Sequence, residues 1–116
     1  MSPFTVVRET PLSVAEAWAA VSDLRSHGEV VPLTRMVLDT GEPHVGWGFA
    51  GGTGAGPVTI WDHMIVTRWD PPRPERPVGA VHIVKTGQWL SGWAHIHIEA
   101  AGEGARVEWT EEISPA

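Results

Sequence analysis

Residues 13–24 have the sequence SVAEAWAAVSDL, the clearest helical pattern in the chain. Ser13 and Glu16 stand three residues apart, as in a capping box, where each side chain accepts a hydrogen bond from a free backbone N–H at the helix start. The apolar residues of this segment recur at helical spacing on one face: Val14, Ala17, Trp18, Val21 and Leu24. The pattern predicts one amphipathic helix over residues 13–24, packed on a sheet.

Strand patterns occupy most of the remaining sequence. One covers residues 4–10, before the helix. The others follow it, separated by turns rich in Gly and Pro: residues 33–39, 45–50, 58–69, 79–86, 89–100 and 105–113. Short turns between consecutive strands are typical of an antiparallel meander. We expect an α+β fold, a curved antiparallel sheet of about six or seven strands with a short helical region after the first strand. Residues 25–32 fit either a short helical turn or a loop.

Composition narrows the class of protein. A length of 116 residues predicts a single domain over residues 1–116. The net charge of -6, without a basic stripe, argues against nucleic acid as a partner. The sequence has no apolar run long enough for a membrane span and no signal peptide, so we expect a cytoplasmic protein. Because it has no Cys, it has no disulfide, no thiolate nucleophile and no cysteine-bound metal.

Four segments together resemble the START-like, helix-grip superfamily (SRPBCC), in particular its polyketide cyclase/dehydrase-like branch. They are the opening strand with residues 13–18 (SVAEAW), then residues 66–72 (VTRWDPP), 92–96 (GWAHI) and 105–109 (ARVEW). The resemblance covers most of the chain. It implies a seven-stranded sheet wrapped around a long C-terminal helix, with a hydrophobic cavity between them. It also implies binding of lipids, sterols, polyketides or similar molecules, and some relatives are cyclases or hydrolases.

The sequence departs from that pattern at its end. It stops at Ala116, where the long C-terminal helix of the superfamily would begin. We therefore expect this helix to be absent from the chain. The sheet face that carries Trp109 should then be covered from outside residues 1–116, most simply by a second copy in a homodimer.

Asp62 and His63 lie in the middle of the longest strand pattern and are candidate catalytic residues. Alternation places them on opposite faces. One face holds Ile60, Asp62, Met64 and Val66, and the other holds Trp61, His63, Ile65 and Trp69. Since both faces are largely apolar, one polar group should lie near the core, where a shifted pKa suits it to proton transfer. Alternatively, one is exposed and the other is hydrogen-bonded to the structure.

Glu111 is a third candidate catalytic residue. It follows Val107 and Trp109 on one face of the last strand. If it points inward, it can anchor a ligand or act as an acid; at the rim of the sheet it would meet water, and we favour the rim.

His95, His97 and Glu99 share one face of the 89–100 strand with Trp93. They form either a set of zinc ligands or a row facing solvent, and His82 on the neighbouring strand joins them only if the register allows it. A zinc site usually needs three or four converging ligands with outer-shell support. We therefore expect no metal and no cofactor.

Two further features restrict the chemistry. The glycine-rich run over residues 51–56 lacks the Lys-Ser/Thr ending and the following helix of a phosphate loop, so we expect a hairpin loop. Lys85 is the only lysine, and a Schiff-base mechanism would depend on it.

The expected function is binding of a small hydrophobic ligand in a cavity on the concave face of the sheet. An enzyme that uses acid and base groups in that cavity, or a protein-interaction or dimerisation module, are the alternatives. The candidate ligand contacts are large side chains on the helix and strands: Trp18, Trp61, Met64, Trp69, Ile96 and Trp109.

Overall fold

A computed structural model describes residues 3–23, 34–55, 57–88 and 90–115. Within these ranges the chain forms one helix and seven strands. In chain order they are β1 (Phe4–Thr10), α1 (Val14–Ser22), β2 (Thr34–Leu38), β3 (Gly48–Ala55), β4 (Val58–Asp70), β5 (Val78–Lys85), β6 (Leu90–Ala101) and β7 (Gly104–Pro115). The predicted α+β architecture is confirmed.

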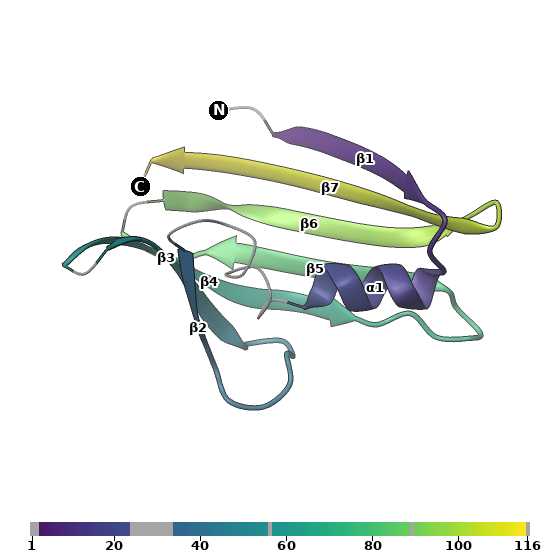
Figure 1. Cartoon of the computed structure of the whole chain (residues 1–116), viewed down its shortest axis with the longest axis horizontal. Helices are drawn as coiled ribbons and strands as arrows, with labels where there is room; N and C mark the ends of the chain where they lie inside the picture. The colour runs from purple at the N-terminus through teal and green to yellow at the C-terminus, as the bar shows by residue number, and fades with distance from the viewer. Residues whose placement is uncertain (1–2, 24–33, 56, 89, 116) are drawn as a thin grey trace.

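All seven strands form a single antiparallel sheet in the order β1-β7-β6-β5-β4-β3-β2. Each strand from β2 to β6 pairs with the next one in the sequence, as in a meander. β1 instead lies at the opposite edge of the sheet from β2 and pairs with β7. Figure 1 shows α1 lying across one face of this sheet.

We call the sheet face that packs against α1 the helix face. Its described residues include Phe49, Met64, Val66, Val81, Ile83, Ile96, Val107 and Trp109. The opposite side, the outer face, carries the residues that alternate with them, among them His63, His82, Trp93, His95, His97, Glu99 and Glu108. Strand alternation thus separates a mainly apolar face from a mainly polar one.

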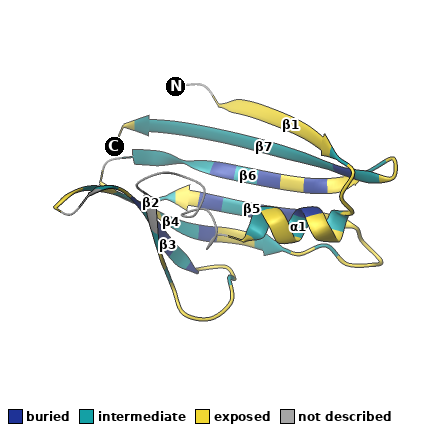
Figure 2. Cartoon of the chain, in the orientation of Figure 1, coloured by how far each residue is buried: buried dark blue, intermediate teal, exposed yellow. Residues whose placement is uncertain are grey.

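The hydrophobic core lies on the helix face. The buried members of its main cluster are Trp47, Phe49, Val66, Val81, Ile83 and Ile96. Figure 2 shows the buried positions concentrated on β5 and β6, the central strands beneath α1. From the helix, Ala17 packs against Ile98 and Ala105, and Trp18 meets Trp69 edge to face at 5.1 Å.

The capping box of α1 is confirmed. The Glu16 N–H donates to Ser13 Oγ at 3.1 Å, and the Ser13 N–H donates to Glu16 Oε1 at 3.1 Å. These hydrogen bonds lower the pKa of the Glu16 carboxyl. The helix ends at Ser22, with Asp23 as its C-cap. The rest of the predicted helical region, residues 24–32, lies outside the described residues.

The prediction that residues 51–56 form a loop is wrong, because residues 51–55 belong to β3. This strand pairs on both sides: Gly51 faces Met36 of β2 and Asp62 of β4. Its backbone groups therefore have partners in either direction. The ring of Trp61 also lies against Gly52, where a Cβ would come within 2.6 Å of it. The missing side chain makes room for this indole.

The predicted face of Trp69 is also wrong. A register irregularity between Val66 and Arg68 interrupts the alternation of β4. An extra residue of this kind reverses the facing of the residues that follow it. Trp69 consequently packs against the core on the helix face rather than sharing a face with Trp61 and His63.

Candidate functional site

The helix face carries an ion pair, formed by Asp62 of β4 and Lys85 of β5. Lys85 Nζ lies 2.5 Å from Asp62 Oδ2 and 3.7 Å from Met64 Sδ. The side chains are only 10% exposed for Lys85 and 23% exposed for Asp62. An amine and a carboxylate are therefore held in contact at the margin of an apolar surface.

Local sequence explains how each partner reaches this position. Asp62 precedes Met64 and Val66 on the same side of β4. Lys85 ends β5 after Val81 and Ile83, and it pairs in register with Met64. Its aliphatic stem can lie along the apolar surface while its ammonium group turns toward the carboxylate.

Three buried polar atoms have no hydrogen-bond partner within the described part of the chain. They are Asp62 Oδ1, Trp47 Nε1 and Trp109 Nε1. Buried polar atoms without a hydrogen-bond partner are uncommon in folded proteins, so each of the three needs a physical reason. Asp62 Oδ1 can accept a hydrogen bond, and each indole N–H can only donate one. Asp62 and Trp109 both lie on the helix face.

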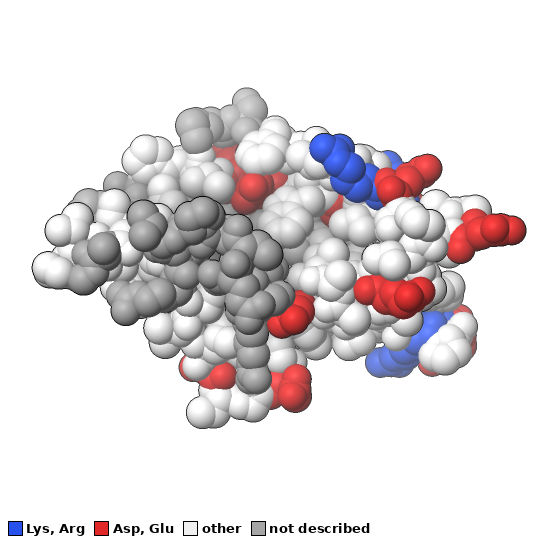
Figure 3. Space-filling view, viewed as in Figure 1, with Lys and Arg blue, Asp and Glu red and all other residues white. Residues whose placement is uncertain are grey.

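The neighbour of Asp62 across the sheet, on β3, is a glycine, Gly51. Among the described residues, a Cβ at Gly51 would meet only Met36 Sδ, at an ordinary contact distance of 3.6 Å. Figure 3, seen from the side of α1, shows that uncharged atoms make up most of the described surface on this side. The Asp62–Lys85 pair is thus a polar group set in an apolar face.

The structure separates the three candidate catalytic residues. Asp62 lies on the helix face, and His63 is exposed on the outer face. Glu111 pairs in register with Ala94 and is partly buried on the helix face, on the same side of β7 as Trp109. Their catalytic roles stay predictions, but only Asp62 and Glu111 face the same side of the sheet.

The candidate ligand contacts also divide between the two faces. Trp18, Met64, Trp69 and Trp109 pack around the core that contains Ile96. Ile96 itself is only 2% exposed and belongs to the packed layer. Trp61 lies on the outer face with His63, away from the others. Lys85 is not among the ligand contacts predicted from the sequence. Its position as the only lysine, at the end of an apolar strand pattern, could have indicated it.

The outer face holds a cluster of three histidines, His82, His95 and His97. The register places His82 of β5 directly opposite His95 of β6. Their rings stack at 3.7 Å with an interplanar angle of 15°. His82 Nε2 lies 2.9 Å from His97 Nε2, a hydrogen bond between two imidazoles. Trp93 packs on His95 at 4.5 Å.

Two members of this cluster have lowered pKa values. Burial, followed by the nearby His95, His97 and Arg68, lowers the pKa of His82 to about 4. Burial and then His97 and Arg68 lower the pKa of His95. Both imidazoles are therefore neutral at pH 7. Among the described residues, no three His, Asp or Glu side chains are arranged to hold a metal ion.

This cluster should make stability depend on pH. The unfolded chain takes up a proton on His82 near pH 6.5, whereas the folded chain resists it until about pH 4. The free energy of unfolding therefore falls as the pH drops through this window. The His82 ring is partly exposed, and solvent screens these interactions. We therefore expect the free energy of unfolding to fall by about 1 kcal/mol, well below the loss that the difference between the folded and unfolded pKa values would give by itself.

Urea denaturation at several pH values in EDTA-containing buffer measures this effect. Arg68 and the other two histidines oppose the proton on His82, and Asp70 favours it. The variant His82→Gln should lose less stability than the unaltered protein between pH 7 and pH 4.5. His44→Gln, at an exposed position, is the control. Identical pH profiles for His82→Gln and the unaltered protein would contradict the prediction.

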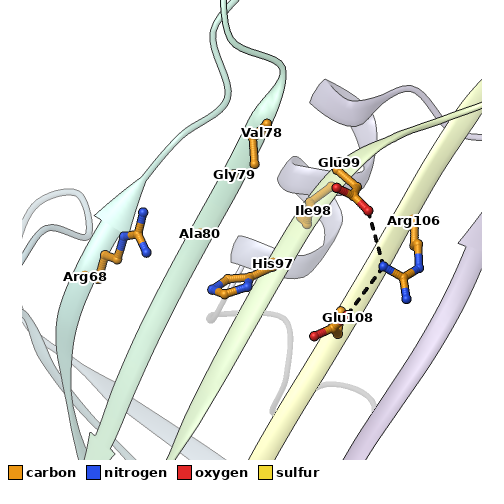
Figure 4. A pocket seen from close by; sticks show the side chains of 9 residues that line it. All are labelled: Arg68, Val78, Gly79, Ala80, His97, Ile98, Glu99, Arg106 and Glu108. Carbon is orange, nitrogen blue, oxygen red and sulfur yellow. Dashed lines mark hydrogen bonds and ion pairs between the residues drawn. The ribbon is translucent and has the colours of Figure 1, made fainter.

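A hollow of about 220 Å³ opens on the outer face next to this cluster. Figure 4 shows its lining residues, with His97 between Arg68 of β4 and Glu108 of β7. Arg68 Nε pairs with Asp70 at 2.7 Å, and Arg106 pairs with Glu99 and Glu108 at 3.2 and 3.4 Å. Since each arginine is already matched with a carboxylate, the hollow offers no unpaired arginine to an anion.

The sequence matches no known family profile and no curated protein. Its structure, however, is similar to solved structures with a helix-grip architecture. For Ara h 8.0201 the TM-score is 0.69 at 14% identity, covering 98% of this chain and 77% of that one. For norcoclaurine synthase from Thalictrum flavum it is 0.66 at 15% identity, covering 97% and 68%. For the Mll3558 protein from Rhizobium loti it is 0.67 at 18% identity, covering 97% and 78%.

The chain has the helix-grip fold. The predicted fold is thereby confirmed, with the strand order and the position of α1 as described above. At identities of 14–18% the similarity establishes the fold alone. In the described residues of this helix-grip chain, β7 runs through Ser114 and Pro115 and no helix follows it. No described helix is long and apolar enough to cross a membrane.

Proposed function

We propose that this helix-grip protein binds a small, mainly apolar molecule that carries a hydroxyl or carbonyl group, on the helix face of its sheet. The observation that supports this most directly is the Asp62–Lys85 pair, in which Asp62 Oδ1 has no hydrogen-bond partner among the described residues. Binding sites are typically apolar surfaces with a few polar groups that orient the ligand. A ligand hydroxyl that donates to Asp62 Oδ1 would remove the cost of a buried, unpaired acceptor, about 1–3 kcal/mol.

The chemistry of the face favours oxygenated ligands over plain hydrocarbons. Asp62 Oδ1 accepts a hydrogen bond, while Trp109 Nε1 and Lys85 Nζ donate. Polyketides, hydroxylated lipids and similar molecules combine apolar area with such groups. Norcoclaurine synthase, which shares the fold, has been solved in complex with dopamine and hydroxybenzaldehyde. Those are small oxygenated aromatic molecules, and we propose the same general class here.

Calorimetric titration with 2-naphthol and naphthalene tests this proposal, because the two ligands differ by one hydroxyl group. We expect 2-naphthol to bind about fivefold more tightly, the value of one hydrogen bond. Gly51→Leu, which places a large side chain next to Asp62, should abolish binding of both. His63→Gln, on the outer face, should change neither. Thermal unfolding unaffected by either ligand and by a panel of fatty acids and polyketides would overturn the proposal.

An enzyme acting at the same place is the second candidate. The contact between Lys85 and Asp62 keeps a carboxylate beside an amine, an arrangement suited to moving a proton on a bound carbonyl compound. A cyclase, dehydrase or hydrolase of this kind would use Asp62, with Glu111 on the same face. Asp62→Asn should then abolish turnover without unfolding the protein, and His44→Ala, at an exposed position, should leave turnover intact. Unchanged turnover in Asp62→Asn would dismiss the assignment.

A homodimer is the third candidate, supported by exposed apolar side chains on the helix face. Phe4 is 51% exposed and Ile60 is 53% exposed. A second copy covering this face would bury both. Analytical ultracentrifugation should then show a dimer that Phe4→Glu converts to a monomer, and a monomer at every concentration would eliminate this candidate.

A further inference from the structure

The histidine cluster of the outer face is separate from the helix face and plays no part in the proposed ligand binding. We infer that His82 and His97 form a binding site for a divalent transition-metal ion of the Cu(II) or Ni(II) type. Each would coordinate the ion through Nε2. The remaining coordination positions would be taken by water, because no third protein ligand converges on the pair among the described residues.

The separation of the two nitrogens favours these ions. His82 Nε2 and His97 Nε2 are 2.9 Å apart. Metal–imidazole bonds are about 2.0–2.1 Å long, so two ligands at right angles to each other stand about 2.9 Å apart. Tetrahedral ligands would stand about 3.3 Å apart. Right-angled nitrogen ligands are typical of tetragonal Cu(II) and Ni(II), and Cu(II) also binds most tightly in the general order of divalent ions.

The sheet holds both ligands in place. Since His82 pairs with His95 and Ala80 pairs with His97, His82 and His97 are diagonal neighbours on adjacent strands. The His82 ring stacks on the His95 ring, with 3.7 Å between the ring centroids. Trp93, two residues before His95 on β6, packs against the His95 ring, with 4.5 Å between the centroids. A ring held by stacking loses less conformational freedom when it binds a metal. His95 and Trp93 therefore act as positioning residues.

The proton balance is simple. In the observed pair one Nε2–H donates to the other Nε2. For both nitrogens to bind a metal, the proton on the donor ring must move to its Nδ1, by exchange with water. Each ring then remains neutral with a free Nε2 lone pair. No proton is gained or lost overall, and no oxidation is involved.

The surrounding charges permit a cation. The nearest arginines, Arg68 and Arg106, are already paired with carboxylates. Glu108 pairs in register with His97 and lines the same hollow. A divalent ion at this site would meet Arg68, which also opposes a proton on His82, and this repulsion is partly offset by the carboxylates of Asp70 and Glu108 in a chain whose net charge is -6.

Titration of the tag-free, EDTA-treated protein with CuCl₂, NiCl₂ and MgCl₂ tests the inference. We expect one tight Cu(II) site, weaker Ni(II) binding and no Mg(II) binding. His82→Gln and His97→Gln should each weaken Cu(II) binding by more than about tenfold, while His44→Gln and His63→Gln should stay within about twofold. His97 is exposed, so its replacement leaves the packing intact. Circular dichroism confirms that each variant is folded.

Two spectroscopic readouts locate the ion. Electron paramagnetic resonance of the Cu(II) complex should show coupling to two nitrogens, reduced to one in His97→Gln. Bound Cu(II) should also quench Trp93, so the quenching should largely disappear in Trp93→Phe. The inference is overturned if Cu(II) affinity is unchanged in both His82→Gln and His97→Gln, or if the control variants lose as much. Absence of saturable Cu(II) binding at concentrations up to about 100 μM would also overturn it.

Discussion

Replacing Asp62 with leucine should lower the free energy of unfolding by about 2–3 kcal/mol. Lys85 would be left with its charge in a place where its side chain is only 10% exposed. Removing one partner of a fully buried ion pair typically costs about 3–5 kcal/mol, and Asp62 is more accessible than that reference case. Urea denaturation at pH 7 measures the loss.

The double variant Asp62→Leu/Lys85→Met provides the decisive comparison. Lys85→Met alone should also destabilise the protein, because neither oxygen of Asp62 would then have a partner among the described residues. In the double variant neither charge is left buried, so most of the stability should return. If the losses of the two single variants simply add in the double variant, the two side chains are not coupled and the prediction fails.

Replacing Gly79 with valine should lower the free energy of unfolding by about 2–3 kcal/mol. A Cβ at this position would lie 2.7 Å from the Trp18 ring and 3.2 Å from Pro72. The indole would have to move, and its edge-to-face contact with Trp69 at 5.1 Å would be lost. Overpacking of this kind typically costs about 1–3 kcal/mol, and here it also weakens the docking of α1. Urea denaturation and near-UV circular dichroism of the tryptophans measure the effect.

Two controls test the cause of that loss. Gly51→Ala adds a Cβ at an ordinary contact distance of 3.6 Å and should change stability by less than about 1 kcal/mol. In a Trp18→Ala background, Gly79→Val should cost much less, because the clashing ring is gone. An equal cost in both backgrounds would show that Trp18 is not responsible.

Several parts of the fold could be predicted from local patterns. The capping box at Ser13 and Glu16 depends on residues three positions apart, which any chain entering a helix brings together. The opposite facing of Ile96 and His97 follows from strand alternation. The failures came where the pattern depends on a neighbour. Gly51 is in a strand because β2 and β4 lie on either side of it. Trp69 changes face because of the irregularity after Val66.

By itself, the sequence determined which side chains share a face wherever a strand is regular, and where the single described helix begins. These properties depend only on the geometry of the backbone over a few residues. The tertiary structure alone decided which residues meet across strands. Asp62 pairs with Lys85 and His82 with His97 because the hydrogen-bonded register of β4, β5 and β6 aligns them. A shift of that register by one residue would send each side chain to the other face and abolish both sites.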